Sequence, residues 1–238
     1  MTDELSREAI EGRIAELYQA GMSAYEHEAL REALPPWSQC LAGLRSLGGN
    51  QDMIAILLYY CGTMFATFEL TNQALAFFES AAYILKAQPP TVENADTLLI
   101  AGQSLVAIGH PQHAVPVFKA SAAMFETHDA AELHASAMQE LAAAQESSDE
   151  TGDITPRTYR FAIRHGKTPV ISFTVDATGD IAWADRAAEP DPLAADDPAW
   201  NVQCLGLADG TDGKSKRSGA NPLQKLAKKL LPKKKSAA

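Results

Sequence analysis

The sequence predicts a mainly α-helical protein, built from antiparallel helix pairs and followed by a small β-rich region and a basic tail. Three observations support this fold class. Aromatic residues make up only 7% of the 238 residues while alanine is abundant, which favours helix over sheet. An internal repeat with a period of 40 residues occupies the middle of the chain. The sign of the charge changes near Gly213, which marks a separate tail.

The first 50 residues are expected to form three helices. Leu5–Tyr18 has a helical apolar face and Gly21 at its stop. A second helix, Ser23–Leu34, is expected to end at the pair Pro35-Pro36, because the residue before a proline avoids the helical conformation. A third helix is then predicted over Trp37–Leu47.

The repeat begins after Asp52 and predicts two helix pairs. Small residues at matching positions allow two helix backbones to approach closely, and bulky residues fill the remaining groove. The matched pairs are Leu58 and Leu98, Gly62 and Gly102, Phe65 and Leu105, Ala74 and Ala114, Phe78 and Phe118, and Ala81 and Ser121. A last helix, Ala130–Gln145, caps the stack, so the helical domain is expected to span residues 1–148.

A small β-rich region is predicted at residues 154–207. Thr158–Arg164, Val170–Val175 and Ile181–Trp183 read as strands separated by glycine-containing turns, which predicts a three-stranded meander. We expect Phe161, Phe173 and Trp183 to pack together. Asn201–Leu207 is a candidate for one further strand.

Residues 208–238 are expected to be a flexible linker and a basic amphipathic tail. Residues 1–213 hold 11 basic and 30 acidic side chains, whereas the rest holds nine basic and no acidic ones. Leucines share one helical stripe in the tail and lysines flank it, which leaves four alternatives open: an anionic membrane, a protein groove including this chain's own acidic body, nucleic acid, or a solvated tail. Nucleic acid is the least favoured, because the tail has no aromatic residue for base stacking. The tail residues are Leu223, Leu226 and Leu230, with Lys225, Lys228 and Lys229.

No catalytic, metal or cofactor motif is found, so we expect a non-enzyme without metal or cofactor. His128 and His134 are six residues apart, the wrong spacing for two ligands on one helical face. Gly166-Lys167-Thr168 lies between two predicted strands and lacks the helix that a phosphate loop needs. The run Met53–Phe68 is too short for a membrane span and is expected to be a buried helix. Three cysteines and an acidic N-terminus favour a cytoplasmic location.

The repeat residues resemble the tetratricopeptide repeat, which implies an α-solenoid of stacked helix pairs. The period of 40 departs from the family's shorter one, and the extra residues fall in the loop Ala87–Thr91. The segments Leu98–Leu105 and Gly109–Phe118 further resemble the class II chaperones of type III secretion, which are bacterial tetratricopeptide proteins. This resemblance implies a cytoplasmic chaperone that holds an extended segment of a secreted client until export. The alternative is a scaffold or assembly adaptor that uses the same groove, with or without membrane recruitment by the tail. Whether the chain forms a homodimer is left open.

A stack of this kind offers a concave surface formed by the first helix of each pair, and this is the expected client-binding groove. The mixture of apolar and hydrogen-bonding side chains at the predicted positions suits an extended peptide with a few apolar anchors. For Leu99 and Val106, a place in the core is an equal alternative. The predicted groove residues are Tyr59, Thr63, Ala66, Leu99, Gln103, Val106 and Leu133.

Overall fold

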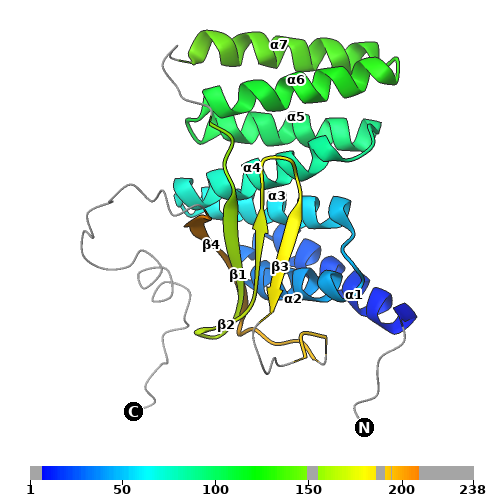
Figure 1. Ribbon diagram of the computed structural model, residues 1–238, viewed down its shortest axis with the longest axis vertical. Coiled ribbons are helices and arrows are strands. Elements are labelled where there is room, and N and C mark those ends of the chain that lie inside the picture. Colours follow the sequence, from blue (N-terminus) through cyan, green and yellow to red (C-terminus); the bar gives the residue numbers. More distant parts are fainter. Residues whose placement is uncertain (1–6, 149–154, 186–190, 194, 209–238) are drawn as a thin grey trace, which may run out of the picture.

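Seven helices followed by an antiparallel four-stranded sheet make up the part of the chain that the computed structural model describes (Figure 1). The described residues are 7–148, 155–185, 191–193 and 195–208. This confirms the predicted mainly helical class with a β-rich region after it, whereas the predicted tail lies outside the described residues. The elements are α1 (Arg7–Glu26), α2 (Leu30–Ser46), α3 (Gln51–Thr67), α4 (Thr71–Ala87), α5 (Val92–Ala107), α6 (Pro111–Thr127), α7 (Ala131–Ser147), β1 (Tyr159–His165), β2 (Thr168–Val175), β3 (Ile181–Asp185) and β4 (Trp200–Leu207).

The same tight turn joins four successive pairs of helices: α1 to α2, α3 to α4, α5 to α6, and α6 to α7. One residue in each turn has a left-handed backbone, and the next residue donates its amide to a carbonyl five positions earlier. In the α3–α4 turn, for example, the Leu70 amide is 2.9 Å from the Phe65 carbonyl oxygen. This bond satisfies a carbonyl at the helix end and reverses the chain, so each pair is antiparallel. The left-handed residues are Glu28, Glu69, Gly109 and Asp129.

A glycine on the first helix of three pairs makes room for an aromatic ring on the second. In each pair the ring lies 16 positions after the glycine, and a Cβ added to the glycine would come within 3.0 Å of that ring. The repeat therefore sets the distance between paired helices through one steric contact. The contacts are Gly21 with Trp37, Gly62 with Phe78, and Gly102 with Phe118.

Two boundaries predicted near the N-terminus are wrong. Helix α1 continues through Gly21 to Glu26, because this glycine lies against the Trp37 ring and does not end the helix. Helix α2 runs through the pair Pro35-Pro36, so the predicted second and third helices are one. The prolines remove two backbone hydrogen bonds at ~3 kcal/mol each. Burial of the Trp37 ring offsets part of this cost, and the carbonyls left without a donor belong to the exposed Arg31 and Glu32, where water is available.

The sheet has the strand order β3-β2-β1-β4, and all its neighbours are antiparallel. The predicted meander is thus confirmed as β1, β2 and β3, and the candidate fourth strand is β4, which pairs with β1. A bulge between Arg160 and Phe161 shifts the register of β1 against β4.

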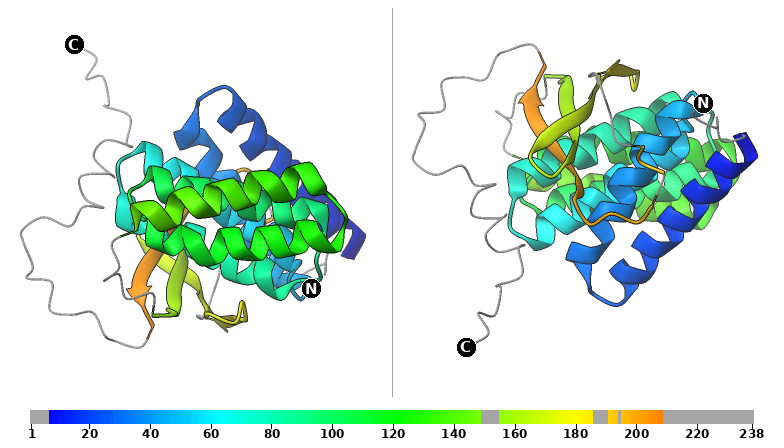
Figure 2. Two further views of the ribbon diagram at one scale, coloured as in Figure 1. Left: turned by 90° about the horizontal axis from the view of Figure 1, so that it is seen from above. Right: turned by 90° about the horizontal axis from the view of Figure 1, so that it is seen from below.

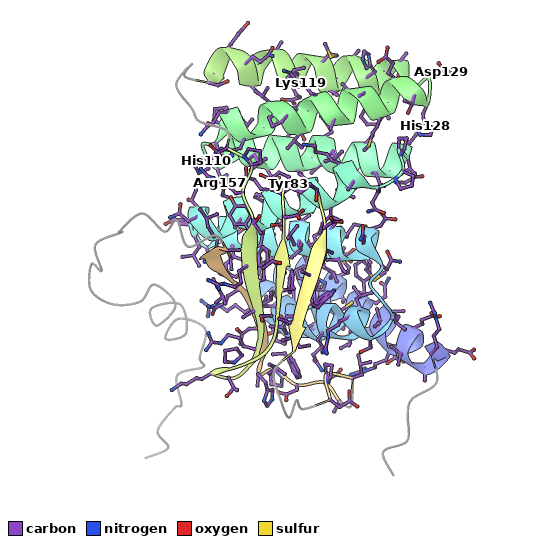
Figure 3. All side chains as sticks on the ribbon, viewed as in Figure 1. Tyr83, His110, Lys119, His128, Asp129 and Arg157 are labelled. Carbon is purple, nitrogen blue, oxygen red and sulfur yellow. The ribbon has the colours of Figure 1, made fainter. Side chains whose placement is uncertain are left out.

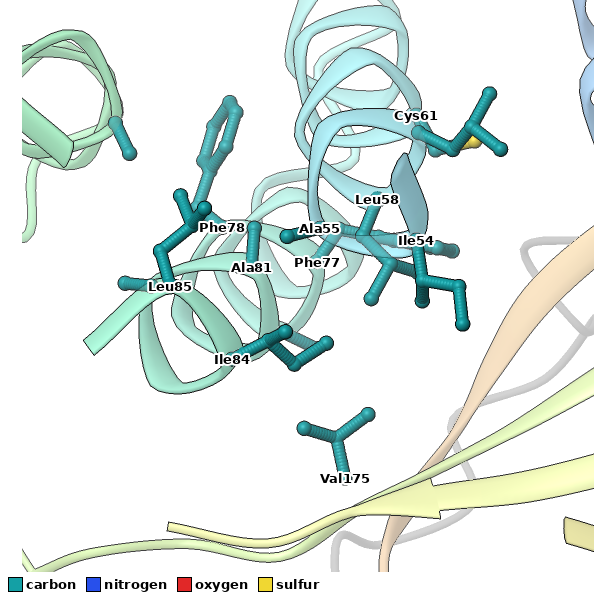
Figure 4. Close-up of a cluster of buried hydrophobic side chains, with 14 of the residues drawn as sticks. Ile54, Ala55, Leu58, Cys61, Phe77, Phe78, Ala81, Ile84, Leu85 and Val175 are labelled. Atoms are coloured by element: carbon teal, nitrogen blue, oxygen red, sulfur yellow. The ribbon is translucent and has the colours of Figure 1, made fainter. Parts of the chain in front are cut away.

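The sheet and the helices share one hydrophobic core, and the sheet packs on α2 and α4. A continuous row of aromatic contacts crosses the boundary, with ring centroids between 4.8 and 5.0 Å apart. The expected packing of Phe161, Phe173 and Trp183 is part of this row. Figure 4 shows the same core from the side of α3 and α4, with Val175 of β2 facing the helices. The row consists of Phe65, Phe77, Phe161, Phe173 and Trp183.

We predict that Gly102→Ala lowers the free energy of unfolding by about 1–3 kcal/mol, because the new methyl group overlaps the Phe118 ring. Gly12→Ala is the matched control, since a Cβ there has no neighbour within 4 Å. That change should raise stability by about 0.5–1 kcal/mol through helix propensity. Chemical denaturation followed by circular dichroism measures both, and equal effects of the two substitutions would contradict the contact.

Candidate functional site

Side-chain contacts place the odd-numbered helices beside one another. The rings of Tyr25 on α1 and Tyr60 on α3 lie 5.3 Å apart. On the other side of α3, helix α5 packs with Ser104 beside Tyr59: burial raises the pKa of the Tyr59 hydroxyl, and the nearby Ser104 lowers it. The Gln103 amide of α5 in turn donates to the Glu140 carboxylate of α7 at 2.8 Å. We call the surface along these contacts the odd-helix face, defined by Tyr25, Ile56, Tyr59, Tyr60, Thr63, Ile100, Gln103, Leu133 and Glu140.

Helical geometry identifies the side chain at the middle of this face on α5. Gln103 points to α7 and Ser104 points to α3, so a residue between these two directions faces outward. At about 100° per residue, Ile100 lies between them. Its side chain is 39% exposed, unusual for isoleucine and consistent with an outward position. The same construction on α3 places Ile56 and Thr63 between Tyr59 and Tyr60.

The predicted groove residues fall into three groups. Gln103 is exposed and Leu133 is 37% exposed on the odd-helix face, whereas Tyr59 and Thr63 are half-buried there. Ala66 is also half-buried and lies one turn further along α3. Leu99 is 6% exposed and belongs to the core, so the core alternative holds for that residue.

Val106 is 36% exposed and therefore is not a core residue, but it lies at the edge of the face beyond Gln103. Sequence reasoning missed Ile56, Tyr60, Ile100 and Glu140. The signal for Ile100 was present, because an isoleucine in register with Asp96 and Gln103 lies on the polar side of α5.

The sheet lies on the opposite side of the helices. Figure 2 shows all four strands on one side of the helices in both of its views. The strands pack on α2 and α4, and the chain before β4 is held to α2 by the Gln39 amide, which donates to the Pro192 and Ala195 carbonyl oxygens at 2.7 Å. The described β-region therefore covers α2 and α4 and also contacts α1, where Arg13 pairs with Asp196 at 2.6 Å, whereas no strand packs on the odd-helix face along α3, α5 and α7.

Three of the helices that line the odd-helix face, α3, α5 and α7, are acidic. Helices α3, α5 and α7 contain no lysine or arginine, and the ten described basic side chains all lie elsewhere. Acidic residues project from all three helices, and among the described residues none of them is paired with lysine or arginine in an ion pair. The acidic residues are Asp52, Glu93, Asp96, Glu132, Glu140 and Glu146.

A buried polar network ties the sheet to the helices. The Glu79 carboxylate on α4 lies 2.5 Å from Nδ1 of His113 on α6 and accepts the Tyr159 hydroxyl of β1. All three residues are only 5% exposed. Burial raises the pKa of Tyr159, and the Glu79 charge raises it further, so this hydroxyl stays protonated as a donor.

Tyr83 and Arg157 lie beside this network, near His110, as Figure 3 shows. His113 is a buried residue of α6.

A pocket of about 360 Å³ lies between α4, β1 and β4, but its Gln73 amide is bonded to the backbone N–H and C=O of Cys204. Gln73 thus completes the hydrogen bonds of an edge strand. All three cysteines are buried, and burial raises the pKa of Cys40 to about 12, which makes that thiol a poor nucleophile.

No described group of histidine, cysteine or carboxylate side chains could hold a metal ion, and no described helix could span a membrane.

No protein family, no curated protein and no solved structure matches this chain.

We predict that Tyr159→Phe destabilises the protein by about 1–3 kcal/mol, because it leaves the buried Glu79 carboxylate without one donor. Tyr83→Phe is the matched control: its hydroxyl only accepts a 3.5 Å contact from the Arg157 amide, so we expect less than ~0.5 kcal/mol. Urea unfolding midpoints of the two variants decide this. If Tyr159→Phe behaves like the control, the network does not hold the sheet in place.

Proposed function

We propose that the odd-helix face binds an extended segment of another polypeptide, and that the chain is a cytoplasmic chaperone of a secreted client, as in type III secretion. One observation carries the proposal: apolar side chains stand exposed on a face that the described β-region leaves open. These side chains are Ile100 on α5 and Leu133 on α7. Exposed apolar groups gathered on one face are typical of an interaction surface.

The repeated helix hairpins support a tetratricopeptide-like arrangement. In such solenoids the first helix of each pair lines the binding surface. Here α1, α3 and α5 are the first helices of the pairs that share the glycine–aromatic contact, and they are the helices of the odd-helix face. The position of the face therefore agrees with the one that this class of protein uses.

The side chains of the face suit an extended peptide. Ile56, Ile100 and Leu133 offer apolar contacts to anchor residues of the client, at roughly 1.5–3 kcal/mol for each side chain that becomes buried. Thr63 and Gln103 lie between them. Their side chains can form hydrogen bonds with backbone groups of the peptide, which replace the bonds to water that those groups lose on binding. A client with apolar surface exposed before assembly would be protected from aggregation by this contact.

Substitution of an exposed anchor tests the proposal without disturbing the core. Ile100→Arg should weaken binding of the client about tenfold or more, since it replaces an apolar contact of the face by a charged side chain. The half-buried Tyr59 is less suitable, because its ring packs 5.7 Å from that of Phe78. Met138→Arg is the matched control. Met138 is 45% exposed on α7 but, two residues from Glu140, points away from the face.

The experiment is affinity purification of the tagged full chain from its native cells, followed by titration of the protein that co-elutes in near-equal amount. A secreted protein whose binding is weakened by Ile100→Arg and not by Met138→Arg supports the chaperone function. If the partner is instead a resident cytoplasmic complex whose binding is weakened by Ile100→Arg and not by Met138→Arg, the result supports the adaptor alternative. Equal binding by both variants would place the partner elsewhere and overturn the proposed face.

A further inference from the structure

Acidic residues lie close in sequence to the exposed apolar residues of the odd-helix face. Its central isoleucine, Ile100, lies one helical turn from Asp96, and Leu133 of α7 follows Glu132 directly. Since α3, α5 and α7 carry no lysine or arginine, no permanent positive charge on these helices balances their acids. A segment that fits such a face has apolar residues at helical spacing and lysines or arginines beside them.

This chain contains one segment of that chemistry. Residues 222–235 contain leucines at positions 223, 226 and 230, a spacing that forms a single stripe on a helix. Six lysines and no acidic residue accompany the leucines. The segment is too short to form a stable helix alone, so a surface that buries the leucines would supply the missing stabilisation.

The connection to the described chain is long enough. The last described residue, Ala208, is fixed by its amide, which donates to the Thr158 carbonyl oxygen at 2.8 Å. Residues 209–221 separate it from Pro222 and span up to roughly 45 Å when extended. Helices of 17 residues are about 25 Å long and pack 8–10 Å apart, so this linker can reach across the helices.

We propose that residues 222–235 dock on the odd-helix face of their own chain, with the leucines against Ile100 and Leu133 and the lysines beside Asp96, Glu132 and Glu140. This inference rests on the face of the proposed function and adds the chemistry of its occupant. The tail holds the face while no client is bound. A client segment must displace it, and basic amphipathic segments are those that compete best.

Attachment to the same chain makes such docking effective even when each contact is weak. Attachment through a linker of 13 residues raises the effective concentration of the tail at the face to roughly the millimolar range, so a weak isolated affinity is enough to occupy the face. The charge contribution is screened at high ionic strength, because the Debye length falls to about 3 Å at 1 M salt. Docking of the tail should therefore weaken as the salt concentration rises. The leucine contacts determine where on the face the tail lies.

Zero-length carbodiimide cross-linking of the full chain tests the docking directly, because it joins only lysines and carboxylates in contact. We expect mass spectrometry to find Lys225, Lys228 or Lys229 joined to Asp96, Glu132 or Glu140 within one chain. The yield should fall several-fold at 1 M salt. Cross-links mainly to acids on other surfaces, such as Glu8 or Glu126, or only between two chains, overturn the proposal.

Two variants separate a specific dock from general attraction between opposite charges. The double substitution Leu226→Glu and Leu230→Glu should reduce the cross-links to the face about tenfold, as should Ile100→Arg, whereas Met138→Arg should leave them unchanged. Undiminished cross-links in the leucine variant would mean that charge alone holds the tail, and would overturn the dock. Since no client is present, such a failure leaves the client titration of the proposed function unaffected, and the two hypotheses fail separately.

Discussion

The contact between a glycine and an aromatic ring is the constraint on which the rest of the structure depends. It recurs in three helix pairs, as Gly21 with Trp37, Gly62 with Phe78 and Gly102 with Phe118. Because the ring occupies the space of the missing side chain, the two helices of a pair approach closely and in the same register each time. The same register in each pair brings the first helices side by side, and their outward residues form one continuous face.

The β-region determines which side of the helices stays available. Its aromatic row, from Phe77 through Phe161 to Phe173, continues the helical core and fixes the sheet to α2 and α4. The buried Glu79 carboxylate fixes the orientation of the sheet on the helices more closely than apolar packing alone, because it is hydrogen-bonded by side chains from both α6 and β1. The sheet packs on α2 and α4, whereas the exposed Ile100 lies on α5 in the odd-helix face.

Local patterns in the sequence predicted the elements well, whereas contacts distant in sequence were missed. The 40-residue repeat predicted the pairs around Gly62 and Gly102 because both copies are regular. The equivalent pair at Gly21 was missed, since Pro35 and Pro36 suggest a helix end, whereas α2 continues through them and buries Trp37. The side chains of Leu99 and Ile100 point in directions about 100° apart around the helix axis. An error of one residue in the predicted helix register therefore exchanges a core position for a surface position. The partners of Glu79 lie 34 and 80 residues away and follow no local pattern.

Amide hydrogen exchange of the full chain, with and without its co-purified client, tests the central claim most directly. Binding on the odd-helix face predicts slower exchange in α3, α5 and α7 and unchanged exchange in α2 and α4, which the sheet already covers. Protection confined to the strands or to the even-numbered helices would contradict the proposed binding face.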